Sequence, residues 1–497
     1  MENTLENSSG IGRLKWKFFI YRAVSYFSFL CVPVFVQKGV HLGMGFQAFF
    51  MSIYILFIVG QWFLLGKEID HRFKIYFRVN SSIDRVVYRL FLGMIFFVIL
   101  FNFISFLESR WIANSVWTIW ISLGLFYSWP TRGKIIQESV SSNFGEFKFL
   151  DGFEKTLFSL ILLMFFFSLP DLPPLVNVEM LKLYFDPMEK IGNSFFNFLI
   201  VNYYPFKNYP GLIRMAWTLH FYIVGMGFFL LVFYALLRFY VSRRLSLLGV
   251  FALVSSWSFS KTLITNVEFT LITTYSVLWL WTILWVTKSS TYRAGLFMGL
   301  VSYWGALLNP GFSLLVIFQL GFLYFVFLKD RTFWYKRQLF KYSLFGTVLT
   351  IIYFFNHTEA LDFTSTFNGG AWHVLRQELD RKGFYVLSIL GLVVLILKSW
   401  GNTLSAFQIE VDNVKMFLLT LLLAVFFSIL GEEYLLKGFS MIWMLAFMSV
   451  VPLELVFQSI SRLRSNRNMI YLIYILICLL DSHFEGRVKE FLKIFNS

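Results

Sequence analysis

Two acidic residues with helical spacing lie in a long polar segment, residues 170–214, that interrupts a series of apolar stretches. Asp186 and Glu189 are three positions apart, so both carboxylates share one side of a helix that starts near Pro187. In that position they could act in catalysis or bind a ligand. Asp before Pro is also a common helix N-cap, so a purely structural role for Asp186 stays open.

Two further ionisable residues fall where the chain is otherwise apolar. Glu268 lies at the start of the stretch 267–287, and His220 lies one to two turns inside the stretch 215–238. Ionisable groups at membrane depth are costly and normally face an interior cavity or a functional site. The alternatives are an interfacial ion pair of Glu268 with Lys261 and a hydrogen-bonded helix contact for His220.

A second polar segment, residues 356–383, carries two arginines that could bind phosphate. The guanidinium groups of Arg376 and Arg381 suit this task because arginine contacts phosphate oxygens in a bidentate manner. A solvated amphipathic helix over 372–381 with mixed charges explains the same residues equally well.

The composition of the chain indicates how such residues are positioned. It has 497 residues, of which 58% are hydrophobic and 14% charged, whereas soluble proteins carry about 25% charged residues. Its apolar runs recur at about the length that crosses 30 Å of hydrocarbon as a helix. Continuous runs, without alternation, exclude a transmembrane barrel and leave helices. We therefore predict an all-α polytopic helical membrane protein with about 15 transmembrane helices, in a range of about 13–17.

Lys and Arg concentrate in alternate connecting segments, which the positive-inside rule assigns to the cytoplasm. This places the N-terminus in the cytoplasm and residues 170–214, 258–266 and 356–383 on the exterior side of what we expect to be a bacterial inner membrane. The basic segments are 67–89, 129–155, 238–244, 288–293, 329–341 and 462–467. The predicted spans are 17–36, 45–66, 88–107, 111–128, 156–169, 215–238, 246–260, 267–287, 293–308, 311–328, 340–355, 384–398, 414–430, 438–457 and 468–480.

Other broad classes of function are not supported by the sequence. The formal charge of +15 is spread over connecting segments and forms no clustered basic face, so no nucleic-acid partner is predicted. The two cysteines, Cys31 and Cys478, lie in apolar spans, which argues against a disulfide framework or a zinc site. P-loop, dinucleotide-binding, Gly-x-Ser-x-Gly and His-Glu-x-x-His motifs are absent from the sequence.

The organisation that we predict has five parts. They are an N-terminal four-helix membrane region (1–130), a cytoplasmic linker (131–155), a transmembrane module with its long exterior loop (156–330, loop 170–214), a C-terminal transmembrane region with a second exterior loop (331–480, loop 356–383) and an amphipathic tail (481–497) at the membrane interface.

The module 156–330 has a distinctive order of parts. An apolar helix leads into the acidic exterior loop, which ends in the aromatic-proline stretch Tyr203-Tyr204-Pro205. A helix with a basic cytoplasmic end follows, then Glu268 at the start of another helix, and then a Gly-x-x-x-Gly-Leu helix with Gly295 and Gly299 before Asn309-Pro310. This order resembles the GT-C superfamily of integral membrane glycosyltransferases, which use polyprenyl-phosphate sugar donors.

The resemblance implies transfer of a sugar from a polyprenyl-phosphate donor to a cell-envelope acceptor on the exterior face. Asp186 would be the general base for the acceptor hydroxyl, while Glu189 or Glu268 would position the acceptor. A divalent cation, Mg²⁺ or Mn²⁺, would be held by Asp186 and Glu268. The lipid phosphate and the rest of the substrate would be bound by Lys261, Arg376, Arg381, His220 and Tyr204.

Two other functions are open. The segment 216–222, Ala-Trp-Thr-Leu-His-Phe-Tyr, is similar to a signature of membrane acyltransferases of cell-surface polymers. The chain could also be a non-catalytic transporter or scaffold. Convergence of Asp186, Glu189 and Glu268 in one exterior cavity would favour the glycosyltransferase, and a tunnel centred on His220 would favour acyl transfer.

Overall fold

The computed structural model describes the following part of the chain. The described ranges are 44–73, 82–104, 150–167, 209–256, 267–288, 292–308, 382–401, 409–429, 441–460 and 466–482, together with positions 259 and 404 and scattered residues within 16–36, 119–126, 341–349 and 486–489.

Every regular element in these ranges is a helix, which confirms the all-α prediction for the described part. Three of the helices are long and apolar enough to cross a membrane, namely Phe46–Arg72, Thr218–Leu237 and Ile442–Ser459. Shorter apolar helices occur at Thr273–Val286, Gly383–Ser399 and Arg467–Leu480. These helices support association with a membrane. The total of about 15 spans stays a prediction, because segments such as 311–328 lie outside the described residues.

The chain forms two compact units. Unit 1 comprises Met1–Lys74, Val79–Phe149 and Val176–Val224, and unit 2 comprises Ile75–Arg78, Leu150–Leu175 and Gly225–Ser497. These two units are defined by contacts in space, whereas the five predicted parts were defined by features along the sequence. The units therefore do not test the five parts, which stay a prediction.

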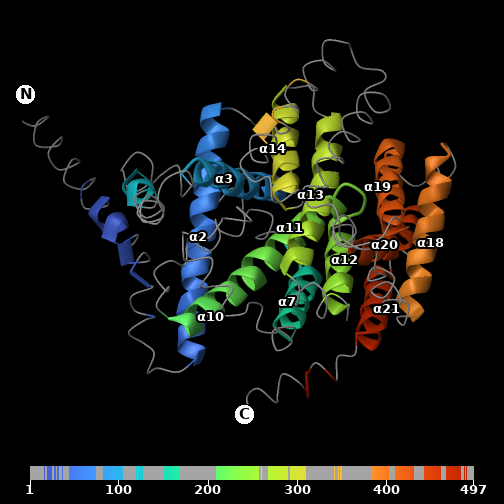
Figure 1. Ribbon diagram of the computed structural model, residues 1–497. Helices are drawn as coiled ribbons and strands as arrows, with labels where there is room; N and C mark the ends of the chain where they lie inside the picture. Colours follow the sequence, from blue (N-terminus) through green and yellow to red (C-terminus); the bar gives the residue numbers. More distant parts are fainter. Residues whose placement is uncertain are drawn as a thin grey trace, which may run out of the picture. The chain divides into compact units, whose positions relative to one another are not determined.

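In unit 1, helix α2 (Met44–Phe73) packs against α3 (Ser82–Ile104) and α10 (Pro210–His220) (Figure 1). Two glycines allow α2 and α3 to meet. A Cβ atom on Gly66 would lie 1.8 Å from the carbonyl oxygen of Arg89, and one on Gly93 would lie 1.7 Å from that of Trp62. Only a residue without a side chain fits at such an approach. Close to this crossing, Arg89 Nε lies 3.4 Å from Asp70 Oδ2.

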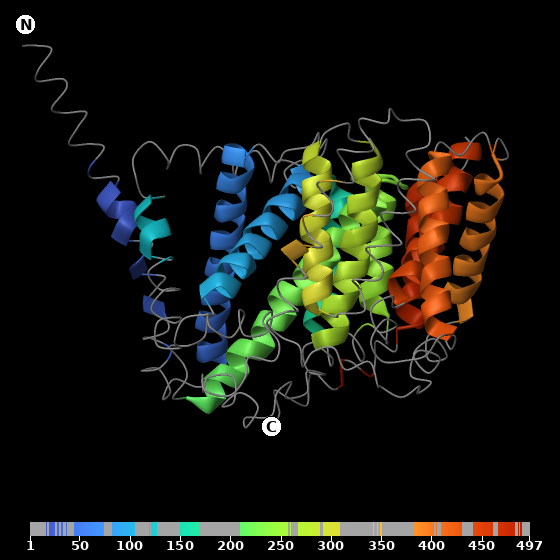
Figure 2. The same cartoon turned by 45° about the horizontal axis from the view of Figure 1, so that its top comes forward.

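The described helices of unit 2 are joined partly by short connections, which favour antiparallel neighbours. Helix α13 packs against α14 and α11, and α18 packs against α20. Figure 2 shows α13 and α14 side by side, and α18 beside α19. Their bounds are α7 (Gly152–Phe167), α11 (Gly227–Leu237), α12 (Arg243–Ser255), α13 (Val267–Lys288), α14 (Tyr292–Leu308), α18 (Lys382–Ser399), α19 (Val411–Ile429), α20 (Met441–Ser459) and α21 (Arg467–Leu480).

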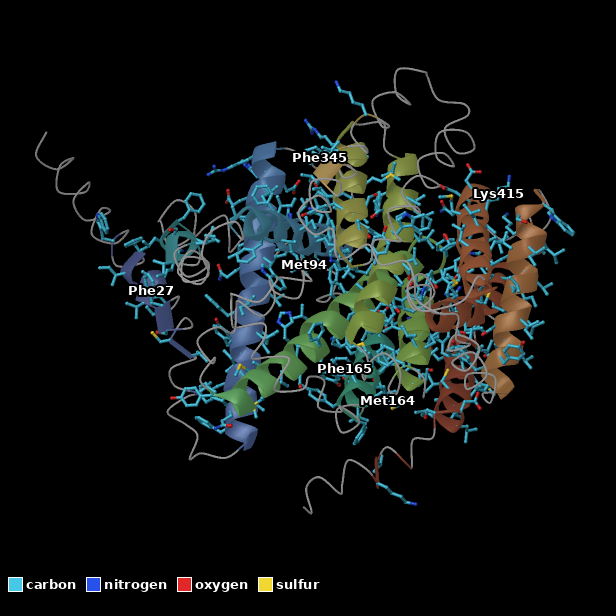
Figure 3. The ribbon with its side chains drawn as sticks, viewed as in Figure 1. Phe27, Met94, Met164, Phe165, Phe345 and Lys415 are labelled. Carbon is cyan, nitrogen blue, oxygen red and sulfur yellow. The ribbon has the colours of Figure 1, made fainter. Side chains whose placement is uncertain are left out.

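Helix α12 lies at the centre of unit 2. All its residues from Leu245 to Ser255 are buried, and it packs against α7, α11, α20 and α21. A helix that is covered on all sides needs no polar face, which explains why α12 carries charges only at its start. Helix α7 covers it with one face only, and Met164 on that face is buried, whereas its neighbour Phe165 is half-buried (Figure 3).

Helix α14 approaches α13 closely at a glycine. At Gly305 an added Cβ would lie 2.3 Å from the ring of Tyr275 on α13. The Tyr275 ring therefore lies against the glycine surface. Gly295 and Gly299, earlier in α14, are both buried.

Candidate functional site

Most residues predicted from sequence to do chemistry fall outside the described part of the chain. This holds for Asp186, Glu189, Tyr204, Lys261, Arg376 and Arg381. Their convergence on one exterior cavity therefore stays a prediction.

Glu268 is placed by its backbone, in the first turn of α13. The 22 residues of α13 extend over about 33 Å at 1.5 Å per residue. Glu268 and Lys288, at the two ends of α13, are therefore separated by about the thickness of a hydrocarbon core.

His220 is the last residue of α10, and the π-helix η4 (Phe221–Met226) begins directly after it. Its ring is buried and makes edge-on contacts with the rings of Trp62 on α2 and of Phe221, both at 5.9 Å between centroids. Such a ring environment is that of a packed helix contact. A π-helical turn, however, is often found at functional sites, so this junction remains a candidate.

Four charged residues that were not singled out from sequence form the best-defined polar group of unit 2. We name Asp151, Glu154, Arg243 and Arg244 the ionic cluster. Asp151 and Glu154 cap the start of α7, because each side chain accepts a hydrogen bond from the backbone N–H of the other residue. The Glu154 N–H donates to Asp151 Oδ1 at 2.8 Å, and the Asp151 N–H donates to Glu154 Oε2 at 3.0 Å. This is a capping box with Asp in the first position.

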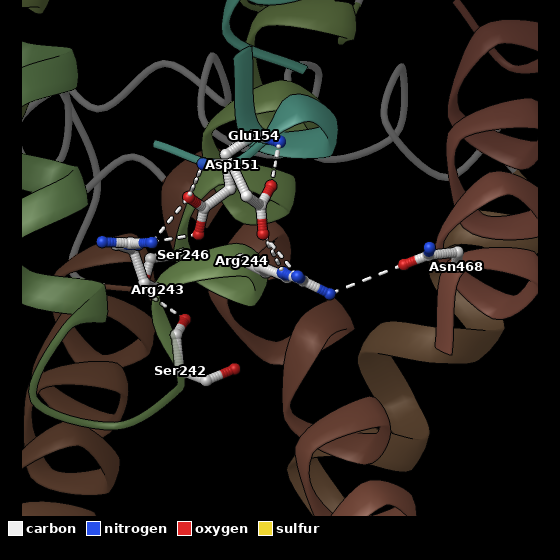
Figure 4. Close-up of polar contacts among 7 residues, drawn as sticks. All are labelled: Asp151, Glu154, Ser242, Arg243, Arg244, Ser246 and Asn468. Carbon is white, nitrogen blue, oxygen red and sulfur yellow. Dashed lines mark hydrogen bonds and ion pairs between the residues drawn. The ribbon is translucent and has the colours of Figure 1, made fainter. Parts of the chain in front are cut away.

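The same carboxylates pair with two arginines in the first turn of α12 (Figure 4). Arg243 donates from Nε to Glu154 Oε1 and from Nη2 to Oε2, both at 2.7 Å. Arg244 donates to Asp151 Oδ2 from Nε at 3.0 Å and also from Nη2. Glu154 is 1% exposed at its side chain and Arg243 is 32% exposed. A short, two-point pair with one partner buried is the strong form of an arginine–carboxylate contact.

The cluster compensates for an unfavourable arrangement of charge. Positive residues in the first turn of a helix oppose its macrodipole, and Arg243 and Arg244 both lie there. The carboxylates of Asp151 and Glu154 neutralise the two arginines. The same negative charges also interact favourably with the macrodipole of α7, because they lie at its N-terminus.

These contacts shift the pKa values of Asp151 and Arg243. Burial alone would raise the pKa of Asp151, but the Glu154 N–H and the Arg244 guanidinium outweigh it and hold that pKa below its usual value. Hydrogen bonds to Glu154 raise the pKa of Arg243 despite its partial burial. Asp151 and Arg243 thus stay charged near neutral pH, so the cluster is suited to holding helices together and not to proton transfer.

A third carboxylate, that of Glu454, extends these contacts to α20. Ser242 is the N-cap residue of α12, and its side chain makes no capping hydrogen bond. Its N–H donates instead to Glu454 Oε2 at 3.0 Å. Gln458, one turn further on α20, donates to Glu454 Oε1 at 2.7 Å. Glu454 therefore caps α12 from a neighbouring helix.

Hydrogen bonds bring together segments that the charge pattern assigned to the same side of the membrane. Arg244 Nη1 donates to Asn468 Oδ1 on α21 at 3.5 Å, and the Tyr240 hydroxyl donates to the carbonyl of Asn413 on α19 at 3.0 Å. The starts of α7, α12, α19 and α21 and the end of α20 thus lie at one end of unit 2. Parts of the basic segments 129–155, 238–244 and 462–467 meet there, as the alternating order of spans requires. That this end faces the cytoplasm stays a prediction.

The described residues contain no group of three or more His, Cys, Asp or Glu side chains that could hold a metal ion. Of the two predicted cation ligands, Asp186 and the side chain of Glu268 both lie outside the described part. The divalent cation therefore stays a prediction.

The ionic cluster had a detectable signal in the sequence. Asp-x-x-Glu at 151–154 is typical of a capped helix start, and the adjacent arginines at 243–244 supply matching charge. Nothing in the spacing indicated that these two pairs would meet.

Compared with protein-family models, with curated proteins and with solved structures, the chain matches none of them.

Proposed function

We propose that this chain is an integral membrane glycosyltransferase that moves a sugar from a polyprenyl-phosphate donor to a cell-envelope acceptor. The observation that carries the proposal is the direction of α12 and α13 within unit 2. Helix α12 starts at the ionic cluster. Trp285, near the end of α13, packs against Phe239, which lies just before that start, with 5.1 Å between the ring centroids. The backbone of Glu268, at the other end of α13, therefore lies away from the cluster, which supports the exterior side that the charge pattern predicts for it and for the loop 170–214.

This direction matters because the reaction needs acidic groups on one side of the membrane. In the proposed reaction the acceptor hydroxyl oxygen bonds to the anomeric carbon, and the bond from that carbon to the phosphate oxygen breaks. The Asp186 carboxylate takes the hydroxyl proton, and Glu268 positions the acceptor. Arg376, Arg381 or Lys261 stabilises the charge on the departing lipid phosphate.

A divalent cation would add to that charge stabilisation. Its oxygen ligands would be Asp186 and Glu268, which are the donor type that Mg²⁺ prefers. The proposal does not depend on the cation, because Arg376, Arg381 and Lys261 would also supply positive charge.

The test uses the full-length protein in lipid vesicles that contain polyprenyl-phosphate sugars radiolabelled in the sugar. Formation of labelled product is measured for a panel of hexose and pentose donors and an acceptor extract from cell envelope. Loss of a general base costs about 10²–10⁴-fold in rate, so Asp186→Asn should lose at least about 10²-fold. Glu179→Gln, in the same loop, is the matched control and should keep activity.

Two results would contradict the proposal. One is absence of turnover with every donor by wild-type protein that is correctly folded. The other is turnover by Asp186→Asn and Glu268→Gln that equals the wild-type rate, since neither carboxylate would then take part.

Acyl transfer is the second candidate, and the junction of α10 with the π-helix favours it. The buried His220 is the last residue of α10, directly before the π-helix η4, and it lies within the segment similar to the acyltransferase signature. In this case His220 would take the proton of the acceptor hydroxyl. The hydroxyl oxygen would bond to the acyl carbon, and the bond from that carbon to the thioester sulfur would break and release the thiol. Transfer of a labelled acyl group from an acyl thioester that is lost in His220→Gln, with no sugar transfer by the wild type, would select this function.

A further inference from the structure

One face of α18 is exposed along the length of the helix. The exposed side chains recur every three or four positions, so they form a single stripe. Within α18 the stripe consists only of aliphatic residues, and Trp400, directly after the end of α18, continues it. Its members are Val386, Ile389, Leu390, Val393, Leu397 and Trp400.

Helix α21 has a matching stripe. Exposed apolar side chains again follow a helical spacing along one side, and no charged residue interrupts them. They are Met469, Leu472, Ile473, Leu476 and Leu480.

The two helices are neighbours at one end. Asp481, which follows α21, accepts a hydrogen bond at Oδ2 from the N–H of Phe384 in the first turn of α18, at 3.2 Å. A Cβ atom on Gly383 would lie 3.1 Å from Ile477 of α21. We name the two stripes together the α18–α21 surface.

The covered faces of the same helices differ in kind. On α18, Ser388 Oγ donates to the carbonyl of Leu445 on α20 at 3.0 Å, and a Cβ on Gly391 would lie 1.9 Å from the carbonyl oxygen of Met448. On α21, the Tyr474 hydroxyl lies 2.6 Å from Ser449 Oγ. Small and hydrogen-bonding residues are those through which membrane helices associate.

We propose that the α18–α21 surface is in contact with the acyl chains of membrane lipids. Its exposed stripes contain none of the small or polar residues that let a further helix approach closely. Large aliphatic side chains instead match hydrocarbon. Trp400 at one end belongs to the residue type enriched at membrane interfaces, and Asp481 marks the opposite end.

The inference rests on the membrane placement contained in the proposed function and is independent of sugar transfer. A lipid contact at α18 and α21 means that these two helix faces border the bilayer.

The test is nitroxide accessibility in the full-length protein, reconstituted in vesicles of phosphatidylcholine and phosphatidylglycerol. In a background with Cys31→Ser and Cys478→Ala, single cysteines replace Val393 or Leu476 and are spin-labelled. Asn468, exposed at the start of α21, is the matched control. We expect collisions with oxygen to exceed those with a water-soluble nickel chelate several-fold at both surface positions and the reverse at Asn468.

Two outcomes would overturn the proposal. Strong nickel collisions at Val393 and Leu476 would show that water covers the surface. Weak collisions with both reagents would show that protein covers it, such as a second copy of the chain.

A measurement on the wild-type chain covers the case in which the cysteine-free background does not fold. Phospholipid with a photoreactive group in its acyl chain should label peptides of α18 and α21 on irradiation, as mapped by mass spectrometry. Labelling confined to other helices would refute the lipid contact. Sugar transfer in the same vesicles is measured separately. Absence of lipid labelling at α18 and α21 would refute the lipid contact without bearing on sugar transfer, and absence of sugar transfer would refute the proposed function without bearing on the lipid contact.

Discussion

The pair between Glu154 and Arg243 gives the sharpest prediction, because its two partners differ in burial. Glu154 is 1% exposed and Arg243 is 32% exposed at their side chains. When Arg243→Gln removes the guanidinium, a buried carboxylate loses its charged partner. When Glu154→Gln removes the carboxylate charge, the arginine can turn toward solvent. We therefore expect Arg243→Gln to be the more destabilising change.

The magnitudes follow from the contacts. Breaking a buried pair from one side costs about 3–5 kcal/mol, which we expect for Arg243→Gln. Loss of hydrogen bonds to a charged group costs about 1.5–3 kcal/mol, which we expect for Glu154→Gln, since glutamine retains one acceptor for the capping box. In the Glu154→Gln background, Arg243→Gln should cost only about 0.5–1.5 kcal/mol, the value of a neutral hydrogen bond.

The assay is denaturant unfolding of the full chain in detergent, followed by tryptophan fluorescence, for the wild type, both single variants and the double variant. Lys155→Gln is the matched control, because Lys155 is exposed on the same turn of α7. An exposed substitution of this kind should change the free energy of unfolding by less than about 0.5 kcal/mol.

The reasoning is refuted if the effects of the two single substitutions add in the double variant. Additivity would mean that the two side chains do not interact in the folded protein. A larger loss for Glu154→Gln than for Arg243→Gln would also contradict it, since the burial of the carboxylate would then not govern the cost.

Three further predictions concern caps, helix crossing and pH. Glu454→Ala leaves the N–H of Ser242 without its acceptor, so the free energy of unfolding should fall by about 1–3 kcal/mol, and a loss below a few tenths would contradict capping across helices. Gly93→Ala forces a Cβ against the facing carbonyl of α2 and should prevent close packing of α2 and α3, measured as loss of monodisperse folded protein on gel filtration. Gly60→Ala, on α2 with open space around it, should be tolerated, and equal damage from both would argue against the crossing. The pKa of Asp151 is lower in the folded than in the unfolded chain, so its stabilising contribution is complete above the ordinary aspartate pKa and is lost as pH falls through the folded value. The wild type should therefore lose more unfolding free energy on acidification below about pH 4 than Asp151→Asn does, and parallel pH curves would exclude this assignment.

Much of the fold class could be predicted from local properties of the chain. Apolar runs predicted helices at α2, α11, α13 and α20 because burial in hydrocarbon requires an internally bonded backbone. The short α21 (Arg467–Leu480) matches the predicted span 468–480, whereas α10 begins at Pro210, before the start of the predicted span 215–238. The π-helix after His220 was not predicted, because one extra residue in a turn leaves the apolar pattern of the helix almost unchanged.

The candidate site was predicted less completely. The pattern identified His220 and Glu268 as unusual, and the structure places the first in aromatic packing and the second at the start of α13. The ionic cluster was missed as a site, although the charges at 129–155 and 238–244 were assigned to one side. Charge counting assigns sides of a membrane but contains no information on which carboxylate meets which arginine.

The sequence by itself determined the helical class and the alternation of basic segments, and it contains the capping pair Asp151 and Glu154, although the predicted span began later, at residue 156. Each of these depends on residues within one or two turns, or on composition, and so can be read from neighbours in the chain. Only the tertiary structure decided that Glu154 pairs with Arg243, 89 positions away, and that Gly66 and Gly93 face each other across α2 and α3. Such pairings depend on how helices pack against one another, and packing is set by the combined shape of many side chains that no local pattern specifies.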